Sequence, residues 1–424
     1  MTFNPFEEKP EKIEKGFSDF EKMYPKSYKK SDIDPYTKTR IILMNGTEFE
    51  SVWCGHTFSR NCPDNDLRRE LATIRKVEQM QQKRITALKP IDETILETTI
   101  GYEQLAVDLT AAMAQEEKDP VVKKAFDLAL LEDFDHLYRY SNLYEMDEHK
   151  HAEELVGNYT EIMPGRPTIS EHRHPNDDIC YWINNKTADP LTKLHASIIT
   201  AAEQQTMNYY MNIGSFYKND LGRKLYSEIA LIEEQHVTQY GSLKDTTCTF
   251  LENMLNHEYT ECYLYYSCMQ DETDEHIRKI WELHLNQEIS HLHKIAKLLK
   301  KYEKRDASEV IKDGAFPKLL HIGPNKSYVR EIIKTSVYAT REREEYVDAN
   351  KYSGKDFINY QSIVNKNPEK TPSHAVIVKK QTEDGQDYRY TDSPVPNEEL
   401  QDRTKDNITV GRNKANIKET KSVK

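Results

Sequence analysis

The sequence lacks the features that mark several common classes of protein. Its six cysteines are spread over 424 residues, and none forms a Cys-x-x-Cys pair. This spacing excludes a rubredoxin-like iron site and a zinc ribbon, and it favours reduced thiols in a cytoplasmic protein. No apolar run approaches the roughly eighteen residues of a transmembrane helix, so we expect no membrane partner. The start, MTFNPFEEKPEK, has no basic segment followed by an apolar one, so we expect no secretory signal.

Charge and short motifs exclude further classes. The net charge of −12 argues against a nucleic-acid-binding protein. We find no phosphate-binding loop, no dinucleotide fingerprint and no Ser-His-Asp order. A composition with 37% hydrophobic and 31% charged residues is typical of a soluble, strongly helical protein.

What the chain does contain is a recurring spacing of acidic residues and histidine. Three times, a glutamate precedes an acid-x-x-His motif by thirty residues. The three sets are Glu103 with Asp133 and His136, Glu203 with Glu233 and His236, and Glu258 with Glu288 and His291. A turn-like segment lies at the midpoint of each set, so each set predicts a helical hairpin with both motifs at the same height.

Apolar residues at helical spacing support this interpretation. They predict six long helices over 93–117, 120–147, 190–217, 220–244, 247–270 and 274–302, which form the hairpins 93–147, 190–244 and 247–302. In 120–147 the acid and the histidine lie within the apolar stripe that runs from Phe126 to Tyr140. The sequence therefore places ionisable groups on faces that should be buried.

Buried carboxylates need a partner, and divalent cations are suitable ones. Positions i and i+3 share a helix face, so an acid and a histidine at this spacing can reach one metal while a facing helix supplies another carboxylate. Oxygen-rich ligation with one nitrogen per metal suits iron or manganese better than zinc. The alternative is that these residues form salt bridges on helix surfaces, since acid-x-x-His is common in helical proteins.

The hairpin sequences resemble the ferritin-like superfamily, especially its rubrerythrin-type members. The resemblance rests on YEQLAVDL before LLEDFDH, AAEQQTMNYY before ALIEEQH, and HEYTECYLYY before LNQEISH, and it covers roughly 93–302. It implies a four-helix bundle with a di-iron or di-manganese centre. It further implies that Glu103, Asp133, His136, Glu203, Glu233 and His236 hold the metals. The chain departs from the family at Asp133, where glutamate is usual, and in carrying a third hairpin.

Connection lengths indicate which hairpins share a site. A ferritin-like bundle needs a long crossover between its hairpins, and residues 148–188 can provide one. We therefore expect hairpins 93–147 and 190–244 to form one site. Hairpin 247–302 would then be unpaired. Either its acids form salt bridges within the chain, or two copies meet across a two-fold axis in a homodimer.

The flanking segments are predicted with less regular structure. Residues 1–90 should contain an arm, a β-hairpin over 38–53 that turns at Asn45-Gly46, and a polar helix over 65–88. Residues 91–304 should form the ferritin-like domain, and residues 305–424 an irregular, partly disordered extension. Within that extension we expect one helix over 327–347 and one strand over 374–379, followed by a polar tail over 380–424.

Together these features predict a soluble oxidoreductase with a two-metal centre that acts on peroxide or dioxygen and takes electrons from an unknown donor. The alternatives are a ferritin-like scaffold without catalysis and a metal-handling protein. Tyr102, Tyr140 and Tyr240 are candidates for a redox tyrosine or for core packing. His172 and His174 are weaker metal-ligand candidates.

Overall fold

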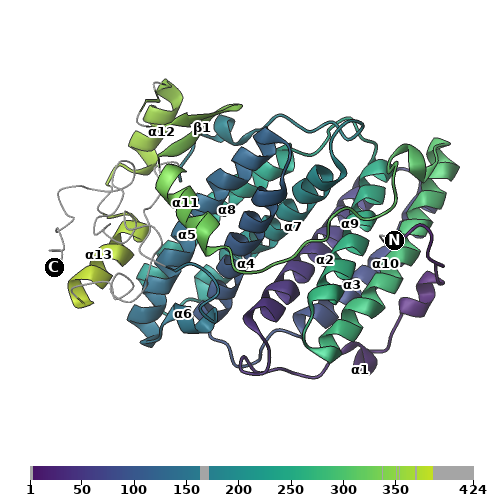
Figure 1. The fold of residues 1–424 in the computed structure, drawn as a ribbon, viewed down its shortest axis with the longest axis horizontal. Coiled ribbons are helices and arrows are strands. Elements are labelled where there is room, and N and C mark those ends of the chain that lie inside the picture. The colour runs from purple at the N-terminus through teal and green to yellow at the C-terminus, as the bar shows by residue number, and fades with distance from the viewer. Residues whose placement is uncertain are drawn as a thin grey trace. The chain divides into compact units, whose positions relative to one another are not determined.

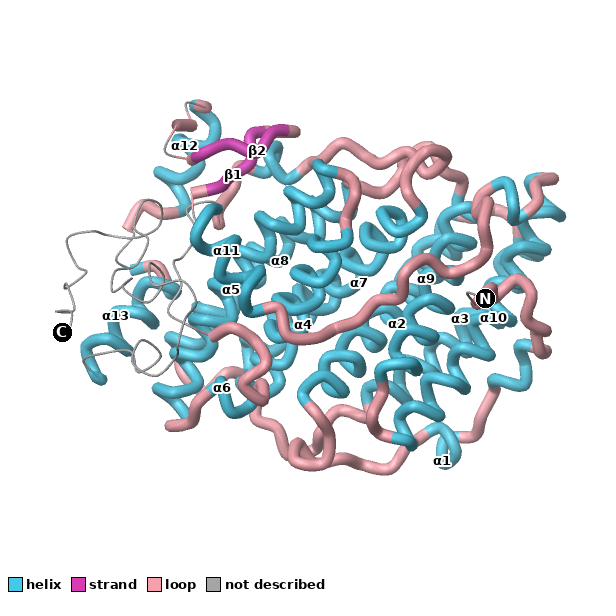
Figure 2. Tube along the Cα trace, in the orientation of Figure 1, coloured by secondary structure: helices cyan, strands magenta, loops and turns pink. Residues whose placement is uncertain are grey.

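The computed structural model describes residues 3–162, 171–336, 338–349, 351–352, 354–367 and 370–384. Within these residues the fold is mainly helical, as expected, and one small antiparallel sheet lies near the C-terminal end (Figure 2). The long helices are α2 (Pro35–Asn61), α3 (Asn65–Thr86), α4 (Ile95–Glu116), α5 (Pro120–Glu148), α7 (Pro190–Ile213), α8 (Asp220–Ser242), α9 (Phe250–Asp271) and α10 (Glu275–Glu303). The six helices predicted between 93 and 302 are all present.

Shorter elements fill the connections and the C-terminal part. The short helical elements are η1 (Ile13–Gly16), α1 (Phe20–Met23), α6 (Ala152–Leu155), η2 (Pro175–Asp178), η3 (Gly214–Phe216) and η4 (Ala307–Glu309). The C-terminal elements are α11 (Lys326–Ser336), β1 (Ala339–Glu342), β2 (Glu345–Asp348), α12 (Lys355–Val364) and α13 (Pro372–Asp384).

The chain divides into two compact units, and each is assembled from three stretches of sequence. Unit 1 contains Met1–Asp92, Trp182–Gln205 and Lys244–Ile322. Unit 2 contains Glu93–Tyr181, Thr206–Leu243 and Gly323–Lys424. The segments expected from the sequence, 1–90, 91–304 and 305–424, cut across these units.

Unit 1 is built on a bundle of α2, α3, α9 and α10. The helices α2 and α3 form one hairpin and α9 and α10 another, with α2 beside α9 and α3 beside α10 (Figure 1). Polar caps fix where the hairpins turn. The side chain of Asp64 accepts hydrogen bonds from the first turn of α3, and that of Asp274 does the same for α10.

The predicted β-hairpin over 38–53 is wrong, because these residues lie inside α2. The run Ile41–Met44 is fully buried, and a short buried apolar run does not by itself distinguish a strand from a helix. Gly46 does not form a turn. A β-carbon at this position would lie 2.7 Å from Gln205 and 3.0 Å from the carbonyl oxygen of Ala201. Gly46 therefore allows α7 to approach α2 closely. The helix predicted over 65–88 is confirmed as α3.

Unit 2 is centred on α5, which packs against α4, α8, α11 and α13. Its core contains apolar side chains from all of these helices, including Ile100, Phe134, Ile229, Ile333 and Val376. Thr94 begins α4 with a reciprocal pair of hydrogen bonds to Glu97, and Asp119 begins α5. These caps bring Glu103 and Asp133 to matching heights of one hairpin.

Two expectations for the C-terminal part need correction. The helix expected over 327–347 ends at Ser336, and residues 339–348 form the hairpin of β1 and β2. The strand expected over 374–379 is wrong, because these residues belong to α13. Val376 and Ile377 are buried within that helix, so their apolar run reflects a packed helix face. The polar tail expected over 380–424 lies, from residue 385 onward, outside the described residues.

The helix boundaries repeat along the chain at a fixed offset. The helices α2, α3, α4 and α5 begin at residues 35, 65, 95 and 120, whereas α7, α8, α9 and α10 begin at residues 190, 220, 250 and 275. Each later helix thus starts 155 residues after its earlier counterpart. The caps repeat too, since Thr94 with Glu97 and Thr249 with Glu252 form the same capping box. This regularity indicates an internal duplication of residues 35–148 and 190–303.

The duplication explains why the units are discontinuous. Unit 1 takes its first hairpin from the first repeat, α2 and α3, and its second from the second repeat, α9 and α10. Hairpin 247–302 is therefore not unpaired, contrary to the expectation from the sequence. Unit 2 takes α4 and α5 from the first repeat and α8 from the second.

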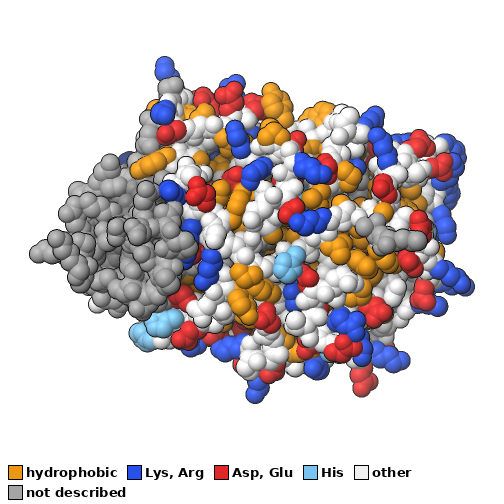
Figure 3. Space-filling model, viewed as in Figure 1, with side chains coloured by type: hydrophobic (Ala, Val, Ile, Leu, Met, Phe, Trp, Pro, Cys, Tyr) orange, Lys and Arg blue, Asp and Glu red, His pale blue; other side chains and the backbone are white. Residues whose placement is uncertain are grey.

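Among the described residues, no helix combines the length and the apolar character needed to cross a membrane. Figure 3 shows acidic and basic side chains interspersed over the visible face. The carboxylates of the group around Glu288 in unit 1 and of the group around Glu233 in unit 2 are buried.

Candidate metal centres

Five carboxylates and one imidazole meet in the interior of unit 1. Each of the four bundle helices contributes, and none of the six side chains is more than 1% exposed. The residues are Glu48 on α2, Glu78 on α3, Glu258 and Glu261 on α9, and Glu288 and His291 on α10. Glu78, Glu258, Glu288 and His291 each offer a ligand atom, and these four atoms lie within 4.8 Å of one another.

His291 directs one ring nitrogen into this cluster. Its Nδ1 lies 2.8 Å from Glu78 Oε1, 2.9 Å from Glu288 Oε2 and 3.7 Å from Glu258 Oε2. Gln81 lies one turn after Glu78, and its amide donates to Glu288. No described residue donates a hydrogen bond to either oxygen of Glu258. The cluster therefore has more acceptor oxygens than the protein has donors for them.

The charges in this cluster are poorly balanced by the protein alone. Burial, together with the charges of Glu78 and Glu288, raises the pKa of Glu48 well above its usual value. Burial and the neighbouring carboxylates also raise the pKa of Glu258 and Glu261. Although burial opposes it, attraction by Glu288 and Glu78 raises the pKa of His291 well above normal. Bound cations would relieve this repulsion.

A chain of hydrogen bonds through Arg84, His284 and Tyr265 holds one carboxylate oxygen of Glu48. The Arg84 guanidinium lies 2.8 Å from His284 Nε2, and since arginine can only donate, this nitrogen is the acceptor. Burial and Arg84 lower the pKa of His284 well below its usual value, so the ring is neutral. Its Nδ1–H then donates to the Tyr265 hydroxyl at 3.0 Å, and Tyr265 donates to Glu48 Oε1. The second oxygen of Glu48 is left for the cluster.

Unit 2 contains a second buried cluster with two histidines. Ligand atoms of Glu103, His136 and Glu233 lie within 4.8 Å of one another, and so do those of Asp133, Glu233 and His236. Glu233 belongs to both groups. Its two oxygens are divided between the two rings, because Oε1 lies 3.0 Å from His136 Nδ1 and Oε2 lies 3.5 Å from His236 Nδ1. Glu233 could therefore contribute one oxygen to each group.

The second nitrogen of His236 is held by an outer carboxylate. Its Nε2 lies 2.7 Å from Glu132 Oε2, while Arg173 donates to Glu132 Oε1 at 2.6 Å. Burial opposes ionisation of Glu132, but Arg173 and His236 lower its pKa to about 2. The ionised Glu132 thus keeps the proton of His236 on Nε2 and leaves Nδ1 to face Asp133 and Glu233. This arrangement is typical of a metal-binding histidine.

Tyrosines close one side of the unit 2 cluster. The Tyr210 hydroxyl on α7 donates to Glu103 Oε1. Tyr140 packs against Tyr210 and Tyr226, with ring centroids 5.3 and 4.9 Å away. All three rings are at most 1% exposed. They exclude water from the space beside Glu103 and His136.

Of the six residues predicted for this site, Glu203 alone is assigned to unit 1. It is buried on α7, two turns before Tyr210 and on the same helix face. In unit 1, Glu258 likewise lies two turns before Tyr265, and Glu258 belongs to that cluster. That Glu203 joins the unit 2 cluster stays a prediction.

The sequence analysis missed part of the unit 1 cluster. Glu48 and Glu78 are also thirty residues apart, but Gln81 stands where the other three hairpins have histidine. The carboxylate spacing alone would have found this fourth hairpin. The pattern Glu258-x-x-Glu261 does indicate Glu261, one turn after Glu258, whereas nothing in the spacing indicates the outer role of Glu132.

Of the weaker candidates, His172 offers a ligand atom that lies within 4.8 Å of ligand atoms of Glu171 and Glu228, so these three residues could hold a metal ion. His172 Nε2 lies 3.4 Å from Glu228, and His174 accepts a hydrogen bond from the backbone of Asn176. Tyr102 stacks on Tyr209, with ring centroids 4.5 Å apart. Tyr240 is fully buried in the core.

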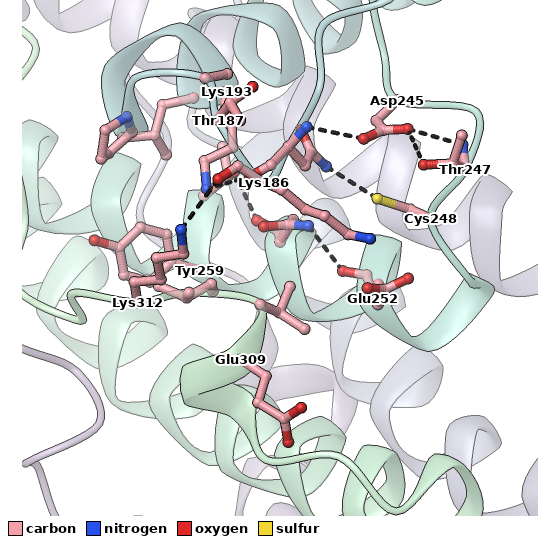
Figure 4. Close-up of a pocket in the computed structure, with 18 of the residues that line it drawn as sticks. Lys186, Thr187, Lys193, Asp245, Thr247, Cys248, Glu252, Tyr259, Glu309 and Lys312 are labelled. Carbon is pink, nitrogen blue, oxygen red and sulfur yellow. Dashed lines mark hydrogen bonds between the residues drawn. The ribbon is translucent and has the colours of Figure 1, made fainter.

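Unit 1 also contains a cavity of about 740 Å³ that is lined by none of the cluster residues (Figure 4). The ammonium groups of two lysines that line the cavity contact main-chain carbonyl oxygens. Lys193 donates to Asn185 at 3.4 Å, and Lys312 donates to Lys186 at 3.1 Å. This cavity therefore shares no lining residue with the candidate metal centre of unit 1.

Comparisons with known protein families, curated proteins and solved structures return no match to this chain.

Proposed function

We propose that this protein is a ferritin-like oxidoreductase with a two-metal carboxylate centre in each unit, acting on peroxide or dioxygen. One observation carries the proposal. In unit 1, five buried carboxylates surround His291, the ring of His257 contacts only one of them, Glu261, at 3.3 Å, and no lysine or arginine among the described residues enters the group. An interior of this composition is costly unless cations neutralise it.

The donor set favours iron or manganese. Oxygen ligands dominate in both units, and each acid-x-x-His motif adds one imidazole nitrogen. Zinc prefers more thiolate or imidazole, whereas magnesium and calcium prefer oxygen alone. In unit 2, Glu103, Asp133, His136, Glu233 and His236 would hold the metals, with Glu203 as the expected sixth ligand. In unit 1, Glu48, Glu78, Glu258, Glu261, Glu288 and His291 would do so.

Two redox metals would supply the electrons for reducing peroxide or dioxygen. The residues of the chain have supporting roles. Glu132 fixes the proton of His236 on Nε2, and the Tyr210 and Tyr265 hydroxyls each hold one carboxylate oxygen and can donate a proton beside the centre. The buried aromatic rings around Tyr140 keep bulk water away.

Metal analysis combined with single-turnover spectroscopy tests this function. We expect iron or manganese in the purified protein and an absorption band that bleaches on reduction and returns with peroxide. His56→Ala is a suitable control, because His56 lies on α2 outside both clusters. Folded protein that binds neither metal under any loading condition would favour the scaffold alternative.

A further inference from the structure

A groove on unit 2 leads to the outer shell of its metal centre. It encloses about 1110 Å³ and is formed by the exposed face of α8, the segment around His172–Asp178, and the residues that end α12 and begin α13. Arg173 is among the residues that line this groove, and its fully buried guanidinium donates to Glu132, which contacts His236. A continuous chain of hydrogen bonds therefore connects the groove to a metal-binding histidine.

The groove combines exposed apolar side chains with a basic rim. Leu231 is 57% exposed and Ile363 is 71% exposed. Besides the buried Arg173, the basic side chains that line it are Arg223, Lys224, Lys366 and Lys370, and none of these four forms an ion pair among the described residues. The exposed acids on this face are fewer, namely Asp220 and Glu234. The rim is thus positive on a chain whose net charge is −12.

The proposed chemistry needs electrons from elsewhere. The 424 residues contain no Cys-x-x-Cys pair that could hold an iron–sulfur or rubredoxin-like donor. Electrons must therefore reach the centre from a group outside these residues. Apolar contacts within a charged rim suit a transient complex, in which opposite charges speed the encounter.

We propose that this groove is the docking site for a small acidic electron-transfer protein, and that Arg173, Glu132 and His236 form the path from this partner to the unit 2 centre. The proposal rests on the proposed function for its redox role. The partner is defined by its chemistry, which is a surface redox group surrounded by carboxylates and a small apolar patch.

Stopped-flow reduction of the oxidised, metal-loaded protein tests the docking site. The probe is a reduced acidic [2Fe–2S] ferredoxin, and dithionite serves as a donor that needs no docking. With ferredoxin, we expect the rate to fall with ionic strength and to fall about tenfold or more in Lys224→Glu, because charge reversal affects steered association. Leu231→Asp should also slow it. With dithionite, both variants should match the parent.

Matched controls separate docking from general effects. Lys124→Glu reverses a charge on the exposed face of α5, and Leu283→Asp places an acid at an exposed leucine of α10. Neither residue lines the groove, so both variants should keep the parent rate. Equal rates in all variants, or equal losses in groove and control variants, would overturn the docking site.

Binding of oxidised ferredoxin, measured by calorimetry, tests docking independently of redox activity. Salt-sensitive binding that is lost in Lys224→Glu supports the groove, whereas absence of binding to the parent refutes it. If dithionite fails to change the spectrum, the proposed function fails, and the binding measurement still decides whether the groove docks an acidic protein.

Discussion

Tyr210 donates its hydroxyl hydrogen to Glu103, a carboxylate on the facing helix α4. Unit 1 repeats this relationship with different residues, since Tyr265 on α9 donates to Glu48 on α2. Both tyrosines lie seven residues after a glutamate of the thirty-residue pattern, Glu203 and Glu258. In both clusters, therefore, a tyrosine hydroxyl lies beside the first carboxylate of the opposite hairpin.

Tyr210→Phe and Tyr265→Phe should each remove this hydrogen bond and keep the ring. We expect a loss of about 1 kcal/mol in the free energy of unfolding. Metal content should be unchanged, but the absorption band should shift and reoxidation by peroxide should slow. The control is Tyr140→Phe, because no described residue hydrogen-bonds to the Tyr140 hydroxyl. Identical spectra in all three variants would remove the tyrosines from the supporting role.

The two centres should lose metal independently. His236→Ala removes a ligand only from unit 2, and His291→Ala removes one only from unit 1. Each variant should therefore retain about half of the bound metal and stay folded, because packed helices hold a bundle of this kind. Metal stoichiometry and thermal melting measure this outcome. Complete loss of metal from either single variant would contradict two separate centres.

Removal of the metals should make stability depend on pH in a defined direction. Burial and neighbouring carboxylates raise the folded-state pKa of Glu48, Glu258 and Glu261 in the absence of metal. The folded apoprotein then binds more protons than the unfolded chain, so its stability falls as pH rises above about 4.3, the usual pKa of glutamate. Chelated protein should be more stable at acidic than at neutral pH within its soluble range. Glu261→Gln should weaken this dependence, as denaturant titrations at several pH values would show.

Glu272 should stabilise unit 1 where its two hairpins meet. It accepts hydrogen bonds from Arg40 at 3.0 Å, Thr37 at 2.6 Å and Trp281 at 3.1 Å. Glu272→Gln should cost about 2–3 kcal/mol, because Arg40 is left buried without its charge partner.

The effect of this substitution should depend on pH. Burial opposes ionisation, but Arg40 and Thr37 lower the pKa of Glu272. The advantage of the parent should therefore be full above the unfolded pKa of about 4.3 and should be lost as pH falls through the lowered folded pKa. Glu275→Gln is the control, because Glu275 is an exposed glutamate of α10 that pairs with Arg278 on the surface. Equal losses in the two variants would show that Arg40 contributes nothing specific.

Gly46→Ala should destabilise the protein although alanine favours helices. The added β-carbon would meet Gln205 and the carbonyl oxygen of Ala201, and a backbone atom cannot move aside cheaply. Gly55→Ala in the same helix meets only the flexible Arg75 side chain, at 3.2 Å. Gly55→Ala should therefore be neutral or gain up to about 1 kcal/mol from helix propensity. Thermal unfolding compares the pair, and a stabilised Gly46→Ala protein would contradict the close approach of α7.

The sequence by itself determined the helices from 93 to 302 and most of the buried acids. Periodicity acts over a few residues, so apolar stripes such as the one around Asp133, with the turn-like segments between them, were sufficient to place them. The thirty-residue spacing also predicted the hairpins, because a hairpin of fixed length returns its second motif to the height of its first.

Only the tertiary structure decided what hairpin 247–302 pairs with and what residues 38–53 form. The run Ile41–Met44 fits a strand or a helix equally well until its neighbours are known, and Gly46 is explained by the approach of Gln205. Gln81 stands three residues after Glu78, where the other hairpins have histidine, so the acid-x-x-His motif did not identify Glu78. The packing of α3 beside α10 nevertheless brings Glu78 to His291. Pairing between distant segments depends on surfaces that exist only after the helices have formed, and for that reason local sequence rules could not assign it.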